Sequence, residues 1–275
     1  MTILAEIDQF ASQYKRKITV NGINWQYYCL GKGDPIFWLG GGLRRAAIGF
    51  DFLKRLAEKY FVITLDYSPV ENIEAYVSVI DSIIETEGVS QFSIGCQSYG
   101  GLIAQAYLAS KGNKVKKLVL SSTGPVENNR LWIPLLTACV KIFKIMPEKV
   151  AKNFFFGGLG KIITVPKGTK TAWVEALKNI ITNELSKQDV VSHFAVGLDT
   201  IRNNKIKPDV FKGWTGTAVV LRSDNDPTQG KKDILLYSKL FCRPLKVISM
   251  GDMGHTALLS NPAKFTDFFE QALAH

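Results

Sequence analysis

Short apolar runs alternate with amphipathic segments along the first half of the chain, and this alternation restricts the possible fold more than any other feature. Each run is continuous and apolar, which is typical of a strand buried on both faces. In 71–88, by contrast, apolar residues recur at helical spacing. Buried strands separated by helices indicate a parallel sheet with helices on both faces. The predicted strands here are 35–42, 60–67, 91–96 and 115–123, and helices are predicted at 71–88 and 98–112.

A hairpin precedes this alternation, and a long interruption divides it. The segments 18–22 and 24–33 read as two strands joined by an Asn-Gly turn. After Gly124-Pro125 no buried strand stands out until 217, so we expect 126–213 to be an inserted helical cap. The core domain would then be 1–125 and 214–275. A strand with its following loop is predicted at 217–227 and again at 244–256, and helices are predicted at 233–241 and 262–274, which makes a mostly parallel sheet of eight strands.

Composition restricts the class of protein. A chain of 275 residues that is 46% hydrophobic can bury one sizeable core with an inserted subdomain. The formal charge is +10, from 34 basic and 24 acidic residues. The basic residues are scattered in short groups such as Arg44-Arg45, without a long run interleaved with aromatics. This favours a solvated, lysine-rich surface over nucleic-acid binding, and it leaves open an attraction for anionic substrates.

Cysteine spacing and the apolar segments predict the cellular setting. Cys29, Cys96, Cys139 and Cys242 form no CxxC pair, so neither a zinc site nor a disulfide framework is expected. The N-terminal MTILAEIDQF lacks the features of a secretory signal. The apolar stretch 131–140 is too short to span a membrane. We therefore expect a cytoplasmic protein with no metal and no stable membrane insertion, in which 131–146 packs as a lid or lines an apolar pocket.

The stretch SIGCQSYGG (93–101) places Ser98 between a predicted strand and a predicted helix. In an open parallel sheet, ligands bind at this carboxyl edge. A sharp turn there would expose the serine hydroxyl, and the amides of the helix N-terminus would suit a developing oxyanion. The residues around such a turn must be small, as Gly95, Cys96, Gly100 and Gly101 are.

A nucleophilic serine needs a base, and the base needs an orienting acid. The chain has three histidines: His193 lies in the predicted cap, His275 ends the chain, and His255 follows the last strand. Asp224 and Asp226 follow the preceding strand, at the same edge. The order is therefore Ser, Asp, His, each at the end of a strand.

Four motifs together resemble the α/β-hydrolase fold superfamily, in its capped, serine esterase- and lipase-like members. These are FWLGGGL, CQSYGG, SDNDPT and MGHTALLSNP, and the resemblance covers nearly the whole chain. It implies an eight-stranded α/β-hydrolase core with a cap after the sixth strand. It also implies that Ser98 is the nucleophile, Asp226 the acid and His255 the base. The implied oxyanion donors are the backbone amides of Tyr99 and of Gly42 or Leu43.

The sequence departs from the superfamily pattern at two positions that matter for the site. Cys96 stands where most members have glycine, and Gly40-Gly41-Gly42 replaces the usual His-Gly start of the oxyanion loop. Other interpretations stay open. Ser98 could be a helix N-cap, and Asp226 an Asx-turn residue with Asp224 as the acid. We expect Cys96 to be a small buried thiol, and His193 a packed cap residue.

These features predict a cofactor-free serine hydrolase acting on a small-molecule substrate. The expected bond is a carboxylic ester, or else a thioester or amide, of a small to medium apolar compound. One alternative is a cofactor-free lyase or carbon–carbon hydrolase with the same triad, because a fold does not fix the substrate. The other is a non-catalytic binding or scaffold protein. The expected assembly is a monomer or homodimer.

Overall fold

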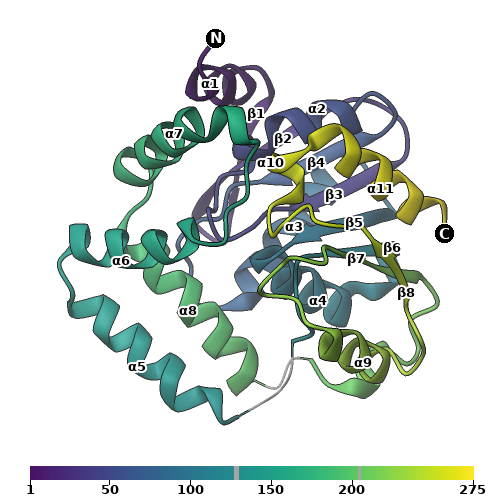
Figure 1. The fold of residues 1–275 in the computed structure, drawn as a ribbon. Helices are drawn as coiled ribbons and strands as arrows, with labels where there is room; N and C mark the ends of the chain where they lie inside the picture. The colour runs from purple at the N-terminus through teal and green to yellow at the C-terminus, as the bar shows by residue number, and fades with distance from the viewer. Residues whose placement is uncertain (127–129, 204–205) are drawn as a thin grey trace.

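One sheet lies at the centre of the molecule, with helices on both faces and a group of helices at one side (Figure 1). The computed structural model describes residues 1–126, 130–203 and 206–275. Residues 127–129 and 204–205 of the predicted cap lie outside the described residues. The α/β class predicted from the alternation of strands and helices is confirmed.

The sheet has eight strands in the order β1-β2-β4-β3-β5-β6-β7-β8. The six strands β4, β3, β5, β6, β7 and β8 are parallel to their neighbours within this group. Strand β2 runs antiparallel to both β1 and β4. Because β3 and β5–β8 are parallel, the loops that follow them meet at one edge. The strands are β1 Lys15–Val20, β2 Ile23–Leu30, β3 Pro35–Leu39, β4 Phe61–Leu65, β5 Phe92–Gln97, β6 Val115–Ser121, β7 Thr217–Arg222 and β8 Lys246–Ser249.

The predicted Asn-Gly hairpin joins β1 to β2. Asn21 and Gly22 both have positive φ, 52° and 76°. Two positive φ angles are the signature of the two-residue turn whose twist matches that of antiparallel strands. Val20 and Ile23 consequently face each other across the turn.

Helices cover the two faces of the sheet with separate apolar clusters. Residues of α3 Ile73–Thr86, α4 Tyr99–Lys111 and α9 Lys231–Leu240 pack on one face. Residues of α1 Ile3–Tyr14, α2 Phe50–Leu56, α10 Ala257–Ser260 and α11 Pro262–Ala274 pack on the other. Helix α1 was not predicted from the sequence, and its apolar residues Ile7 and Phe10 are buried. Short 3₁₀ turns occur at Ala46–Gly49, Gly112–Lys114, Lys167–Thr169 and Pro208–Phe211.

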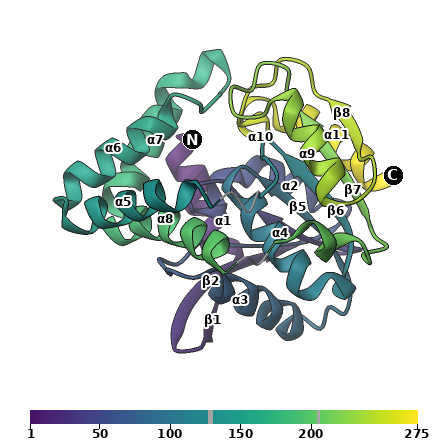
Figure 2. The same cartoon turned by 90° about the horizontal axis from the view of Figure 1, so that it is seen from below.

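Between β6 and β7 the described residues form four α-helices, which we call the cap helices. They are α5 Trp132–Ile145, α6 Glu148–Gly160, α7 Lys170–Asn183 and α8 Lys187–Arg202. They stand together at one side of the sheet in both views (Figures 1 and 2). Their helices α5, α6 and α8 share an apolar cluster around Phe143, Phe155 and Phe156, while α7 packs against α1. The domain boundaries at 126 and 213 remain a prediction.

Candidate active site

The turn between β5 and α4 holds Ser98 in a strained conformation. Ser98 has φ 52° and ψ −119°, in the half of the map that residues with a Cβ rarely occupy. Its amide donates to the Ser121 carbonyl on β6 at 3.1 Å, and its carbonyl accepts from Gly101 N–H at 2.9 Å. The hydroxyl makes no helix-capping hydrogen bond. Ser98 thus occupies the N-cap position of α4 without capping the helix through its side chain, and the strained turn points to another role for the hydroxyl.

Close packing explains the small residues that follow Ser98. A Cβ on Gly100 would lie 2.1 Å from the Leu39 carbonyl oxygen, and one on Gly101 would lie 2.1 Å from the Thr123 hydroxyl. The two glycines allow α4 to start directly against β3 and the end of β6. Side chains at these positions would push the turn away from the sheet edge.

Cys96, two residues before Ser98, fits the turn although most α/β-hydrolases have glycine there. Its side chain is fully buried, and its thiol contacts the Val119 carbonyl of β6 at 3.4 Å. Burial raises the pKa of the Cys96 thiol, which disfavours the nucleophilic thiolate. Cys96 is thus the small buried thiol expected from the sequence.

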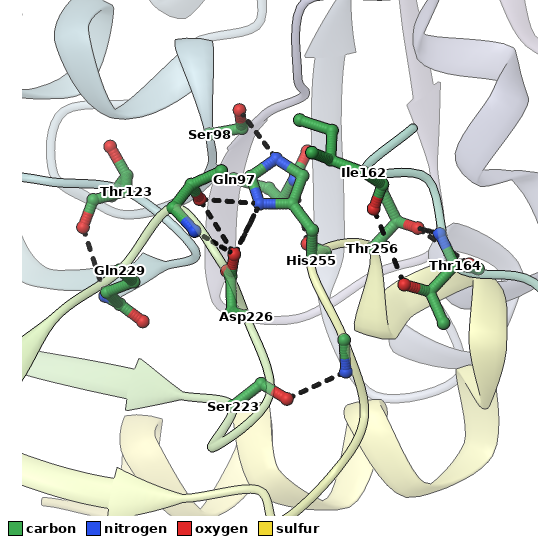
Figure 3. Close-up of polar contacts among 12 residues, drawn as sticks. Gln97, Ser98, Thr123, Ile162, Thr164, Ser223, Asp226, Gln229, His255 and Thr256 are labelled. Carbon is green, nitrogen blue, oxygen red and sulfur yellow. Dashed lines mark hydrogen bonds and ion pairs between the residues drawn. The ribbon is translucent and has the colours of Figure 1, made fainter. Parts of the chain in front are cut away.

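His255 lies beside Ser98 and hydrogen bonds through both ring nitrogens (Figure 3). Its Nε2 is 3.0 Å from Ser98 Oγ. Its Nδ1 is 3.1 and 3.2 Å from the two carboxylate oxygens of Asp226. Because a carboxylate only accepts hydrogen bonds, the network assigns the proton to Nδ1 and leaves Nε2 to accept from the serine. The imidazole is 3% exposed, so water hardly competes for these contacts.

Asp226 is held ionised at the far side of His255. Burial opposes ionisation, but hydrogen bonds from His255 and from the Thr228 amide and hydroxyl outweigh it. Together they lower the pKa of Asp226 to about 2. The bond from the Thr228 amide also makes Asp226 an Asx-turn residue, while its role as the acid stays a prediction. Asp224 faces elsewhere, with Arg222 and Ser249 as partners.

Polar contacts fix the loops that carry these groups (Figure 3). The Gly254 amide donates to Ser223 Oγ at 2.8 Å, which ties the histidine loop to the acid loop. The Gln97 side-chain amide donates to the His255 carbonyl at 3.1 Å. Thr256 exchanges two 2.7 Å hydrogen bonds with the backbone of Thr164, in the loop after α6. The loop after α6 therefore rests directly on the residue that follows His255.

The glycine loop after β3 lies against the nucleophile. A Cβ on Gly41 would be 3.6 Å from the Ser98 Cβ. The Arg44 amide donates a hydrogen bond to the Gly41 carbonyl at 3.1 Å. This bond closes a turn that contains Gly42 and Leu43. Among residues 1–126, 130–203 and 206–275, the backbone amides of Gly42 and Leu43 donate to no other protein group. The Tyr99 amide lies in the first turn of α4, where helix amides have no intrahelical acceptor. That the amides of Tyr99 and of Gly42 or Leu43 bind an oxyanion stays a prediction.

Arg44 follows the glycine loop and is buried, 1% exposed. The prediction of a solvated basic surface is therefore wrong for Arg44. Its Nε donates to Asp189 on α8 at 2.9 Å, and its NH2 group donates to Tyr76 Oη and Ser192 Oγ, each at 3.0 Å. Arg44 thus connects the glycine loop, the core helix α3 and the cap helix α8. No sequence signal distinguishes it from its exposed counterparts.

His193 on α8 also reaches this region. Its ring stacks on Tyr99 with centroids 4.4 Å apart. A Cβ on Gly42 would lie 3.3 Å from its Cε1. Burial, with a smaller contribution from the Arg44 charge, lowers the pKa of His193 to about 3. His193 is a packed cap residue, as expected, but it packs on two of the residues predicted to bind the oxyanion.

A pocket opens beside Ser98, and apolar side chains from core and cap form most of its lining. Trp38, Ile48 and Leu258 come from the core, while Leu159, Ile162 and Ile163 come from the end of α6 and the loop after it. A second apolar groove, between α6 and α7, also reaches Ile163. The predicted lid 131–146 contributes to neither. Small or medium apolar groups fit this lining.

Two features are absent from the part of the chain that the structure describes. No group of three or more His, Cys, Asp or Glu side chains there could hold a metal ion. No helix there combines the length and the hydropathy needed to cross a bilayer.

Comparisons with known proteins identify the fold. No family model matches the chain. A proline iminopeptidase of Lactobacillus delbrueckii subsp. lactis is 30% identical over 139 residues. That match spans 43% of this chain and 47% of the relative, so the chain aligns with about half of the relative's length.

Two solved structures align over nearly the whole chain. A candidate epoxide hydrolase of Pseudomonas aeruginosa has a TM-score of 0.72 at 12% identity, over 94% of this chain and 95% of its own. A thermophilic esterase of Thermogutta terrifontis has a TM-score of 0.72 at 16% identity, over 94% and 98%. With its sheet order and its strained strand–serine–helix turn, the chain therefore has the α/β-hydrolase fold.

Proposed function

We propose that this protein is a serine hydrolase that cleaves a carboxylic ester of a small to medium apolar compound. The observation that carries the proposal is the 3.0 Å contact between Ser98 Oγ, on its strained turn, and His255 Nε2, whose other nitrogen contacts an ionised Asp226. A hydroxyl, a base and an acid in this order form a nucleophilic relay.

The first half of the reaction forms an acyl-enzyme. Ser98 Oγ attacks the substrate carbonyl carbon while His255 Nε2 takes the hydroxyl proton. The charged imidazolium is stabilised by Asp226, which stays ionised because its pKa is about 2. The carbonyl oxygen gains a negative charge, which the amide of Tyr99 and that of Gly42 or Leu43 would bind. His255 then returns the proton to the leaving alcohol, and the carbon–oxygen bond breaks.

The second half hydrolyses the acyl-enzyme. A water molecule gives its proton to His255 Nε2 and attacks the acyl carbon, and the same amides bind the second oxyanion. Collapse of this intermediate expels Ser98 Oγ, which recovers its proton from His255. The apolar pocket beside Ser98 favours an alkyl or aryl acyl group over a polar one.

A serine nucleophile restricts which kind of substrate bond this protein could cleave. The similar proteins carry the names of an esterase, a candidate epoxide hydrolase and a proline iminopeptidase, so the fold alone does not choose among these activities. A serine that opened an epoxide would become an alkyl ether, which has no carbonyl for water to attack, and turnover would stop. Acyl substrates remain, and among them esters have the better leaving group than amides.

The test is labelling of the purified protein with a fluorophosphonate, with the modified residue mapped by peptide mass spectrometry. Ser98 should be labelled, and both Ser98→Ala and His255→Ala should abolish the labelling. Para-nitrophenyl esters from acetate to dodecanoate then give kcat/KM as a function of acyl chain length.

Folded protein that shows neither labelling nor ester hydrolysis would contradict the proposal, and the pocket would then be tested for ligand binding without catalysis. Ser122→Ala is a matched control, because Ser122 is a buried serine at the end of β6 that also has positive φ, 50°. This variant should be labelled like the wild type.

A further inference from the structure

The outward face of α5 exposes large apolar side chains in a helical stripe. Leu135, Ile142 and Ile145 follow one another at spacings of seven and three residues, and Trp132 lies beside them at the start of the helix. Leu135 and Trp132 are each 52% exposed and Ile145 is 84% exposed. The opposite side of α5 packs on α8. Single exposed apolar residues are ordinary, but a stripe along one helix marks an interaction surface.

Helix α6 extends this surface. Val150 and Phe154, one helical turn apart, are exposed, and Phe154 is 72% exposed although its ring meets buried Phe143. In Figures 1 and 2, α5 and α6 lie at the outer side of the cap, away from the sheet. We call the exposed residues Trp132, Leu135, Ile142, Ile145, Val150 and Phe154 the outer cap face.

The segment that carries this face is strongly basic. Residues 132–170 contain one acidic residue, Glu148, and seven lysines, at 141, 144, 149, 152, 161, 167 and 170. The whole insertion 126–213 has 14 basic and seven acidic residues, so it holds +7 of the +10 net charge. Among the described residues, Lys141 and Lys149 are exposed and join no ion pair, whereas Lys144 reaches Glu71 at 2.8 Å.

The combination of positive charge and exposed apolar side chains favours an anionic lipid surface over a second copy of the chain as the partner of this face. Two copies of this face would repel each other, because the segment that carries it has more lysines than carboxylates. A bilayer with anionic headgroups satisfies both features, since lysines meet headgroup phosphates while Trp, Ile and Phe side chains enter the acyl boundary. The face lies on the outside of two neighbouring helices, a shape that a deformable lipid surface accommodates.

We propose that the outer cap face adsorbs reversibly onto a negatively charged lipid surface. Ile145 and Phe154 enter the interface, and Lys141 and Lys149 contact the headgroups. The helices lie in the plane of the surface and do not span it. The proposal does not depend on the chemistry of Ser98, because its residues are separate from the catalytic candidates.

Sedimentation with vesicles tests the proposal. Full-length protein is mixed with vesicles of phosphatidylcholine alone, or of equal parts phosphatidylcholine and phosphatidylglycerol, at low and at physiological ionic strength. We expect binding to the anionic vesicles that weakens as salt is added. The double variant Ile145→Asp/Phe154→Asp should bind at least about tenfold more weakly. Lys141→Gln and Lys149→Gln should each weaken binding about fivefold.

Matched controls carry the same changes on the core. Leu235 on α9 is 67% exposed, so Leu235→Asp removes a similar apolar side chain. Lys32→Gln and Lys246→Gln remove exposed core lysines. All three should bind like the wild type, and circular dichroism verifies that each variant is folded.

Three results would overturn the proposal. The first is failure of the wild type to sediment with anionic vesicles at low salt. The second is equal loss of binding in the core and cap variants, which would mean attraction by net charge alone. The third is a dimer without vesicles that Ile145→Asp/Phe154→Asp dissociates, which would mean that a second copy covers the face.

Discussion

The sheet edge and the cap each bring one histidine close to Ser98, and the two are held in opposite ways. His255, from the loop after β8, has partners on both ring nitrogens, Ser98 and Asp226. His193, from α8, stacks on Tyr99, and its buried Nδ1 has no hydrogen-bond partner among the described residues. A neighbouring carboxylate stabilises the protonated form of an imidazole, whereas burial and a neighbouring guanidinium destabilise that form. The comparison shows that the fold gives two residues of the same type opposite surroundings.

The largest effect is expected from replacing the carboxylate that contacts His255. Asp226→Asn removes the charge that orients the ring and stabilises the imidazolium, and we expect kcat/KM for an ester to fall roughly 10³- to 10⁴-fold. Asp224→Asn is the matched control, because Asp224 contacts Arg222 and Ser249 instead. Steady-state kinetics on both variants decide the matter, and an equal loss in the two would remove Asp226 from the relay.

The next largest effect is a loss of stability where Arg44 connects the cap to the core. Arg44→Met should lower the free energy of unfolding by about 3–5 kcal/mol, because it leaves Asp189 buried without its guanidinium partner. Arg45→Met tests the neighbouring residue, whose pair with Glu184 is partly exposed, and should cost about 1 kcal/mol or less. Urea unfolding measures both. Similar losses would show that the buried network adds nothing beyond an ordinary surface pair.

A pH experiment sharpens the contrast between the histidines. The pKa of His193 is lowered to about 3, so the unfolded chain binds a proton below its ordinary pKa of 6.5 while the folded protein does not. Stability should therefore fall as the pH drops from 6.5 towards 3, by about 2 kcal/mol on reaching roughly pH 5.

His193→Phe should lack this part of the pH dependence while keeping the stacking on Tyr99. Urea midpoints at a series of pH values measure the difference between this variant and the wild type. Parallel curves for the two proteins would show that His193 is protonated as easily in the folded state as in the unfolded one.

The smallest effect concerns the turn. Cys96→Gly should lower the free energy of unfolding by about 1–2 kcal/mol, because it removes a buried side chain and loosens β5. The rate of fluorophosphonate labelling should change little, since Cys96 points at Val119 and away from Ser98. A large change in that rate would mean that Cys96 sets the position of the nucleophile.

The sequence alone determined the arrangement of the sheet edge. Continuous apolar runs with intervening helices require parallel strands, and parallel strands bring their following loops together. Ser98, Asp226 and His255 each follow such a strand, so their proximity could be predicted without coordinates. The Asn-Gly hairpin could also be predicted, because two residues decide its geometry.

Only the tertiary structure decided what depends on contacts between distant parts of the chain. Arg44 looks like any surface arginine until Asp189, 145 positions away, reaches its guanidinium. The stretch 131–146 was expected to face inward, yet its helix packs on one side only and exposes Ile145. Only the structure shows that His255 contacts Asp226, whereas Asp224 contacts Arg222. Local patterns report strands, helices and turns, whereas the burial of one side chain is set by whichever distant segment packs against it.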